Sequence, residues 1–127
     1  MGIRILVVDD HELVRQGIAE LLAGEADLEI VGEAATVAEA LARAAQVDAD
    51  VAVIDVRMPD GNGIELCREL LARQPELRCL ILTSDDSTRA DAITAGASGF
   101  MLKTVLGLRL VDAVRTVGAG GSFLDRD

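Results

Sequence analysis

The chain has 127 residues, enough for one domain with its own core. Half of the residues are apolar, which excludes a disordered chain, but only Phe100 and Phe123 are aromatic, so the core must consist of Leu, Ile, Val and Ala. The formal net charge is −10. This charge disfavours direct binding of nucleic acid by the chain, because such domains neutralise phosphates with basic side chains.

Cysteine usage and the N-terminus indicate a cytoplasmic protein. Cys67 and Cys79 lie in apolar runs without the spacing of metal ligands, so we interpret them as buried thiols and expect no structural disulfide. The apolar run Ile5–Val8 ends at Asp9 and Asp10 and is too short for a signal peptide or a membrane span. We therefore expect no membrane partner.

From the N-terminus, the chain alternates five times between a short apolar run and a segment with helical periodicity. The first pair is a strand over Ile3–Val8 and a helix over Glu12–Ala23. The apolar side chains of this helix fall on one face, which predicts that they pack on a sheet: Leu13, Val14, Ile18, Leu21 and Leu22. The second pair is a strand over Leu28–Gly32 and an Ala-rich helix over Val37–Ala45, with Thr36 as its predicted N-cap.

The third strand is predicted over Asp50–Asp55. After the turn signal Pro59–Gly63, a helix runs to Gln74 and is stopped by Pro75. The last two pairs, in chain order, are the strand Leu77–Leu82 with a helix near Thr88–Ala95, and the strand Gly99–Leu102 with the helix Leu106–Val117.

Residues 118–127 begin with a glycine-rich run. We interpret them as the start of an interdomain linker that follows a domain over residues 1–117, with an output domain absent from this chain. Phe123 is then expected to anchor the linker by packing.

The strands are uninterrupted apolar runs, which is typical of a parallel sheet covered on both faces. Five strand–helix units predict an α/β fold with a doubly wound, five-stranded parallel sheet and five helices. Right-handed crossovers leave few topologies, and the flavodoxin-like strand order 2-1-3-4-5 is common among them.

Polar residues stand where four of these strands end, at the edge of the sheet where such folds bind ligands. They are Asp9 and Asp10, Asp55, Thr83 with Ser84, and Lys103. At an effective dielectric constant of ~20, two carboxylates 4 Å apart repel by about 4 kcal/mol, so three of them require a bound divalent cation, Lys103 or protonation to offset the repulsion. Without a histidine or cysteine ligand expected nearby, this acidic cluster fits Mg²⁺ better than Zn²⁺.

The needs of phosphoryl transfer suggest a role for each residue. Asp55 is the candidate nucleophile, which would become an acyl phosphate. Asp10 would hold the metal directly and Asp9 through water. Lys103 and Thr83 would each contact a phosphoryl oxygen. His11 follows the acidic pair and is interpreted as a polar residue of the first helical turn.

These motifs, in this order, resemble the receiver domains of two-component response regulators from Ile3 to about Val117. The matching residues are Val7–Asp10, Asp55–Gly61, Leu82–Ser84, Gly96–Phe100 and Lys103. The resemblance implies phosphorylation of Asp55 by a sensor histidine kinase and self-catalysed dephosphorylation. It also implies Mg²⁺ held by Asp10, Asp55 and the backbone carbonyl of Arg57. Thr83 and Phe100 would form a switch that remodels the face of the fourth helix, fifth strand and fifth helix.

Asp9–Glu12 and Val117–Gly120 are similar to the NarL/FixJ (LuxR-type) branch of this family. This likeness implies a C-terminal helix-turn-helix domain that binds DNA and regulates transcription. It also allows a homodimer through the first and fifth helices or through the fourth and fifth helices.

The chain departs from the family pattern in two places. Thr104 stands where many members have proline after the lysine, which this branch commonly lacks. Only 12 residues separate Thr83 from Gly96, about two fewer than the family pattern implies. The shortage predicts that the fourth helix is short, shifted or mobile.

Three other functions were considered. A haloacid-dehalogenase-like aspartyl-phosphate phosphatase requires a second Asp two residues after the nucleophile, where this chain has Arg57, and also a cap domain. A nucleotide- or flavin-binding module requires a glycine pattern that the chain lacks. A degenerate receiver that works without phosphorylation is disfavoured, because every residue expected in the pocket is present.

Overall fold

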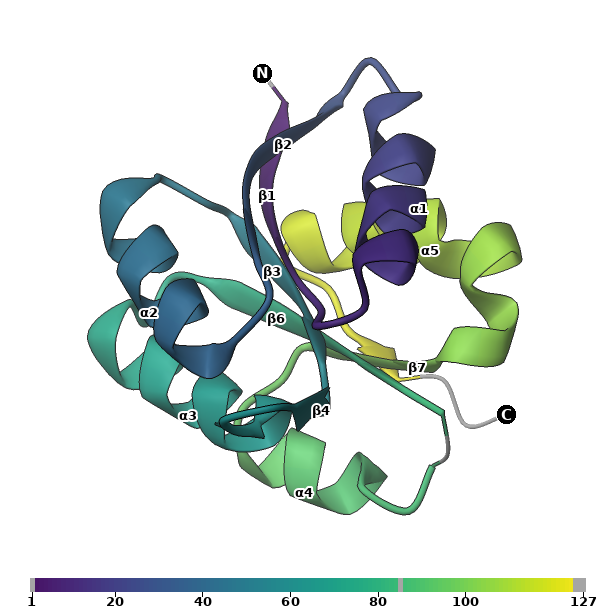
Figure 1. Ribbon diagram of the computed structural model, residues 1–127. Helices are drawn as coiled ribbons and strands as arrows, with labels where there is room; N and C mark the ends of the chain where they lie inside the picture. The colour runs from purple at the N-terminus through teal and green to yellow at the C-terminus, as the bar shows by residue number, and fades with distance from the viewer. Residues whose placement is uncertain (1, 85, 125–127) are drawn as a thin grey trace.

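A computed structural model describes residues 2–84 and 86–124, and Figure 1 shows their three-layer α/β arrangement. The central sheet is parallel throughout, with the order β2-β1-β3-β6-β7-β8. Its strands are β1 (Ile3–Val8), β2 (Leu28–Ala34), β3 (Val51–Asp55), β6 (Arg78–Thr83), β7 (Gly99–Leu102) and β8 (Phe123–Leu124). One face is covered by α1 (Glu12–Ala23) and α5 (Leu106–Gly118), and the other by α2 (Val37–Gln46), α3 (Gly63–Arg73) and α4 (Arg89–Thr94).

The predicted doubly wound sheet and its strand order are confirmed, and a sixth strand, β8, extends the sheet beyond β7. A two-stranded hairpin, β4 (Arg57–Met58) with β5 (Gly61–Asn62), also occupies part of the segment predicted as a turn. Both additions consist of two-residue strands, which are too short to show a periodicity in sequence. The predicted helices have the observed ends to within one residue, apart from α3, whose start was not specified.

Two apolar clusters fill the space between the layers. Alternation along β1 sends Leu6 and Val8 toward α2 and α3, and Ile5 and Val7 toward α1 and α5. Cys67 and Cys79 are buried and unbridged, as predicted. In the described part of the chain, no helix is long and apolar enough to span a membrane.

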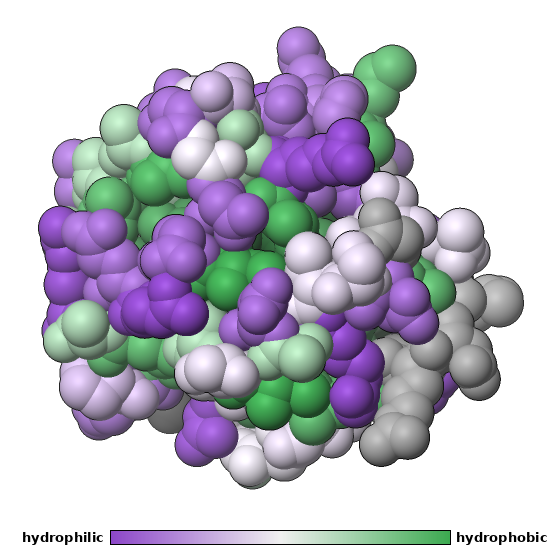
Figure 2. All heavy atoms as spheres, turned by 90° about the horizontal axis from the view of Figure 1, so that it is seen from below, coloured by the Kyte–Doolittle hydropathy of each residue, from purple (hydrophilic) through white to green (hydrophobic). Residues whose placement is uncertain are grey.

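The prediction for the apolar face of α1 is partly wrong. Ile18 and Leu22 are buried, but Leu13 is 82% exposed and Leu21 is 38% exposed. The reason is geometric: the buried residues Ile18 and Leu22 lie four apart, and at about 100° per residue Leu21 lies about 60° and Leu13 about 140° around the helix from Ile18. Among the described residues, the other large exposed apolar side chain is Ile93, and the surface in Figure 2 shows small apolar areas among polar side chains.

Two caps fix the start of α2. The hydroxyl of Thr36 accepts a hydrogen bond from the backbone N–H of Glu39 at 3.0 Å, which confirms Thr36 as the N-cap. The carboxylate of Asp60 accepts from the N–H groups of Val37 and Ala38, at 2.8 and 3.1 Å. These bonds lower the pKa of Asp60 and tie the β4–β5 turn to the first turn of α2.

Helix α4 has only six residues, which agrees with the predicted shortening. Gly96 ends it with a φ of +102°, a conformation that favours glycine. A Cβ atom at this position would also lie 2.8 Å from Cδ1 of Leu71. The C-terminal turn of the short helix is therefore held against α3.

Asp50 is predicted to make stability depend on acid pH. Its carboxylate is partly buried, which by itself raises the pKa, but hydrogen bonds from the guanidinium and backbone N–H of Arg4 lower the pKa below its usual value of 3.8. This stabilisation is present above the unfolded pKa and is lost as pH falls through the folded pKa. We expect Asp50→Asn to lower the free energy of unfolding by about 1 kcal/mol at neutral pH, since partial exposure screens the pair.

Urea unfolding at neutral pH and at a pH below the unfolded Asp50 pKa measures this effect. The difference between wild type and Asp50→Asn should shrink at the acid pH. Asp48→Asn is the control, because its carboxylate is 83% exposed and contacts the same guanidinium. An equal loss of stability by Asp50→Asn at both pH values would contradict the prediction.

Candidate functional site

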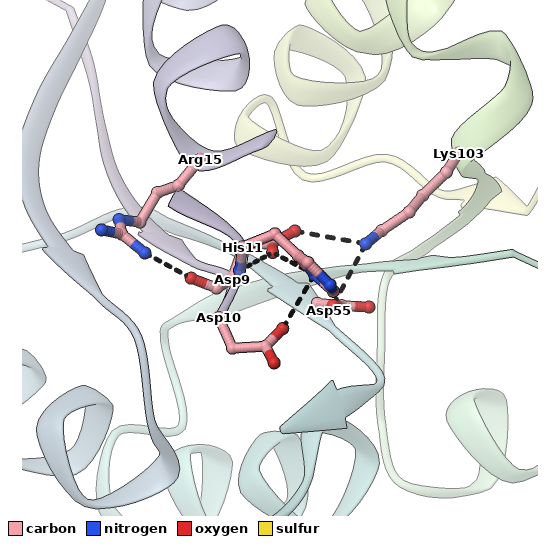
Figure 3. Close-up of polar contacts among 6 residues, drawn as sticks. All are labelled: Asp9, Asp10, His11, Arg15, Asp55 and Lys103. Carbon is pink, nitrogen blue, oxygen red and sulfur yellow. Dashed lines mark hydrogen bonds and ion pairs between the residues drawn. The ribbon is translucent and has the colours of Figure 1, made fainter. Parts of the chain in front are cut away.

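Four parallel strands bring polar side chains to one edge of the sheet. Asp9 directly follows β1, Asp55 and Thr83 are the last residues of β3 and β6, and Lys103 directly follows β7. A pocket of about 300 Å³ opens here, lined by His11, Val14, Asp55, Arg57, Thr83, Ser84 and Lys103. Parallel strands with neighbouring carboxyl ends thus assemble the site from residues that are distant in sequence (Figure 3).

The acidic side chains form a tight cluster. Asp9, Asp10, His11 and Asp55 each offer a ligand atom, and these four atoms lie within 4.8 Å of one another. The Asp9 side chain is 1% exposed, and its Oδ1 accepts a hydrogen bond from the backbone N–H of His11 at 2.8 Å. The cluster therefore concentrates negative charge, with Asp9 and Asp55 buried and Asp10 and His11 more exposed.

One oxygen of the cluster has an unsatisfied hydrogen-bonding capacity. Oδ1 of Asp10 is buried and accepts no hydrogen bond; Nδ1 of His11 lies 3.1 Å away, in a contact that has the distance of an ion pair and is dashed in Figure 3. A buried carboxylate oxygen without a donor is costly unless a cation satisfies it. The oxygen-rich donor set fits a hard divalent cation such as Mg²⁺, whereas the His11 side chain is 65% exposed.

Lys103 bridges two of the carboxylates. Its Nζ lies 3.1 Å from Oδ2 of Asp55 and 3.3 Å from Oδ2 of Asp9 (Figure 3). Burial raises the pKa of Asp55, and Lys103 only partly opposes this increase. Burial lowers the pKa of Lys103, but Asp55 and Asp9 outweigh it and the pKa is raised. Both groups thus favour binding a proton, Asp55 chiefly because it is buried and Lys103 because of the two neighbouring carboxylates.

The backbone around Asp55 is held by the β4–β5 hairpin and α3. The backbone N–H of Arg57 donates to the Asp55 carboxylate, and the N–H of Gly63 donates to the carbonyl of Val56 at 2.7 Å. A Cβ atom at position 63 would lie 2.0 Å from the carbonyl oxygen of Asp55. Helix α3 can approach the end of β3 this closely only with glycine at its first residue.

Sequence reasoning missed two residues that support the site. Gly63 appeared only as part of a turn signal, and the close approach that requires it depends on the packing of α3. Arg15 was not noted; its Nη1 donates to the carbonyl oxygen of Asp9 at 2.7 Å and its Nε to Glu33 at 3.1 Å (Figure 3). No local pattern distinguishes Arg15 from other arginines on a helix.

Of the two residues predicted to form a switch, Thr83 lines the pocket and is 6% exposed. Phe100 is fully buried in the core below α4, opposite Ile81 of β6, and does not line the pocket. Thr83 and Ile81 lie two apart on β6 and therefore point to the same face of the sheet as the Phe100 ring.

Comparison with known proteins agrees with this geometry. Residues 5–115 match the family model of the response regulator receiver domain. The chain belongs to this family. This receiver domain is 57% identical over 125 residues to the DNA-binding transcriptional activator DevR/DosR of Mycobacterium tuberculosis, a match that covers 97% of the chain and 58% of that protein. It is 37% identical to VraR of Staphylococcus aureus over 98% of the chain and 61% of that protein.

Solved structures show the same fold. A LuxR-family two-component response regulator from Aurantimonas sp. SI85-9A1 superposes with a TM-score of 0.92 at 32% identity, covering 97% of this chain and 89% of that one. The receiver domain of NarL from M. tuberculosis has a TM-score of 0.88 at 31% identity, covering 94% and 98%. The chain is thus a receiver domain of a LuxR/NarL-type two-component response regulator, not a haloacid-dehalogenase-like phosphatase. It spans about three fifths of the curated relatives it matches.

Proposed function

We propose that Asp55 of this receiver domain accepts a phosphoryl group from a phosphohistidine of a sensor histidine kinase. The observation that supports this most directly is the position of Asp55 at the end of β3, 3.1 Å from the Lys103 ammonium and within the acidic cluster. An Asp55 carboxylate oxygen would form the new P–O bond while the P–N bond of the donor breaks and its imidazole leaves. Self-catalysed hydrolysis would later return Asp55 to a carboxylate.

We infer that Asp10, Asp55 and the Arg57 carbonyl hold Mg²⁺ at this site, with Asp9 acting through water. The unsatisfied buried oxygen of Asp10 and the carboxylate oxygens of Asp9 and Asp55 beside it support this assignment. Bound Mg²⁺ would neutralise charge on the phosphoryl oxygens. Lys103 is close enough to Asp55 to contact a phosphoryl group attached there, and Thr83 offers a hydroxyl from the same pocket.

We propose that the signal leaves the site through Thr83 and Phe100. Thr83 would move toward the phosphoryl group, and the ring of Phe100 would favour its buried position, which alters the face formed by α4, β7 and α5. DevR/DosR is described as a DNA-binding transcriptional activator and is longer than this chain. By analogy, we propose that this domain acts in the cytoplasm, controls a helix-turn-helix domain and dimerises through α1 and α5 or through α4 and α5.

Labelling with acetyl phosphate tests the proposed phosphorylation. With Mg²⁺, we expect a mass increase of one phosphoryl group per chain by intact mass spectrometry, lost on addition of EDTA because the carboxylates then repel the incoming phosphoryl group. Peptide mapping after borohydride reduction should place the label on Asp55. A label elsewhere, or equal labelling in EDTA, would contradict the proposal.

Lys103→Ala is expected to separate metal binding from signalling. The acidic oxygens remain, so Mg²⁺ titration should give an affinity at least equal to that of wild type. Without the ammonium near Asp55, acetyl phosphate should no longer change hydrogen exchange in α4. Lys103→Arg keeps the charge and serves as the comparison. A wild-type exchange response in Lys103→Ala would contradict the role proposed for Lys103.

A further inference from the structure

The last described residues form a sixth strand at the edge of the sheet. After α5, Gly120 reverses the chain with a φ of +98°, and the N–H of Gly121 donates to the carbonyl of Thr116 at 2.9 Å. The N–H of Phe123 then donates to the carbonyl of Ser98 at 2.9 Å. This places β8 parallel to β7, beside which it lies in Figure 1, with Leu124 opposite Phe100.

Strand β8 contacts both layers of helices. Phe123 packs on the cluster under α5, and the guanidinium of Arg109 lies 4.6 Å from the centre of its ring. Leu124 packs on the opposite cluster, which contains Phe100. Its carbonyl oxygen accepts a hydrogen bond from Nη2 of Arg89, the first residue of α4, at 3.3 Å. Two residues therefore connect β8 to α4, β7 and α5 together.

Leu124 limits where the ring of Phe100 can go. Residues paired across parallel strands point to the same face, and Phe100 has Ile81 of β6 on one side and Leu124 of β8 on the other. Buried Ala92 of α4 belongs to the same cluster above the sheet. A ring that leaves the core must turn toward the outer edge of β7, and that edge is occupied by β8.

We propose that β8 is a latch whose docking on β7 is coupled to the buried position of Phe100. This regulation rests on the proposed function, in which phosphorylation of Asp55 favours the buried ring. Phosphorylation would then tighten β8, and by thermodynamic reciprocity a docked β8 would favour phosphorylation. The docking of β8 would thereby report the phosphorylation state of Asp55 at the face formed by α4, β7 and α5.

Hydrogen exchange of the Phe123 amide tests the latch, because that N–H bonds across the β7–β8 edge. In wild type, treatment with acetyl phosphate and Mg²⁺ should slow its exchange about fivefold or more. Leu124→Ala should speed exchange in the unphosphorylated chain, because it removes the side chain that packs beside Phe100. The amide of Ile3 in β1, which donates to the carbonyl of Asp27 and is separated from β7 by β3 and β6, should not respond.

Leu21→Ala is the matched variant, since it truncates a partly exposed leucine on α1, whose main sheet contact is β2 at the edge opposite β8, and it should leave Phe123 exchange unchanged. If acetyl phosphate adds the mass of one phosphoryl group but does not slow the exchange of the Phe123 amide, the latch is overturned and the proposed phosphorylation is not. Absence of any mass increase would instead refute the proposed function and, with it, the control of the latch by phosphorylation.

A double-mutant cycle of Leu124→Ala and Phe100→Leu tests the contact without phosphorylation. Each single variant should raise the unfolding equilibrium constant. If the two side chains stabilise each other, the increase in the double variant should be about fivefold smaller than the product of the two single increases. Multiplicative effects would overturn the coupling between β8 and Phe100, whatever the outcome of the labelling experiment.

Discussion

Replacing Asp55 by Asn is expected to abolish labelling by acetyl phosphate. The amide of Asn carries no negative charge and is a poor nucleophile, so the position beside Lys103 loses its acceptor. The expected result on intact mass spectrometry is complete loss of the phosphoryl mass under conditions that label wild type fully. Asp112→Asn, an exposed carboxylate on α5, should be labelled like wild type.

A folding control accompanies this variant. Burial raises the pKa of Asp55, so its contribution to stability is greatest below the unfolded pKa and is lost as pH rises through the folded pKa. Removing the charge should therefore leave the variant at least as stable as wild type at neutral pH by thermal unfolding. A stable Asp55→Asn protein that still takes up one phosphoryl group would refute Asp55 as the acceptor.

Replacing Gly63 by Ala is expected to destabilise the fold strongly. The added Cβ would lie 2.0 Å from the carbonyl oxygen of Asp55 and 2.9 Å from the side chain of Ile54. Backbone at the end of β3 yields less easily than a flexible side chain, so α3 must move away. We expect the free energy of unfolding, measured by urea titration, to fall by about 3 kcal/mol or more. This loss lies at the upper end of the range for substitutions that overpack a core.

Gly17→Ala provides a control of opposite sign. Gly17 is exposed in the middle of α1, and a Cβ there would meet no atom within 4 Å. Alanine should therefore stabilise the protein by about 0.5–1 kcal/mol through lower entropy of the unfolded chain and better helix propensity. Equal stability of Gly63→Ala and wild type would show that α3 relaxes without cost. In that case, the close approach would not be needed to form the site.

Gly63→Ala should also weaken Mg²⁺ binding, because α3 and the β4–β5 hairpin hold the backbone that follows Asp55. The N–H of Arg57 donates to the Asp55 carboxylate, and the N–H of Gly63 holds the Val56 carbonyl. A shift of α3 would displace both. Stability and metal affinity should therefore fall together in this variant, whereas Gly17→Ala should leave metal affinity unchanged.

The sequence alone determined the sheet and the residues at its functional edge. Uninterrupted apolar runs indicate buried parallel strands, and the residue after each run necessarily lies at the shared carboxyl edge. This reasoning places Asp9, Asp55, Thr83 and Lys103 at one edge without any knowledge of packing. The short α4 could also be predicted, because a count of residues between Thr83 and Gly96 limits its length.

Only the tertiary structure decided how the elements meet. The exposure of Leu13 depends on how α1 is rotated about its own axis over the sheet. Helical periodicity predicts this rotation only to within about one residue position. The need for glycine at position 63 depends on the distance between α3 and β3. Strand β8 forms because β7 offers an unpaired edge and two apolar clusters to cover. Such contacts join residues far apart in the chain, so no local pattern records them.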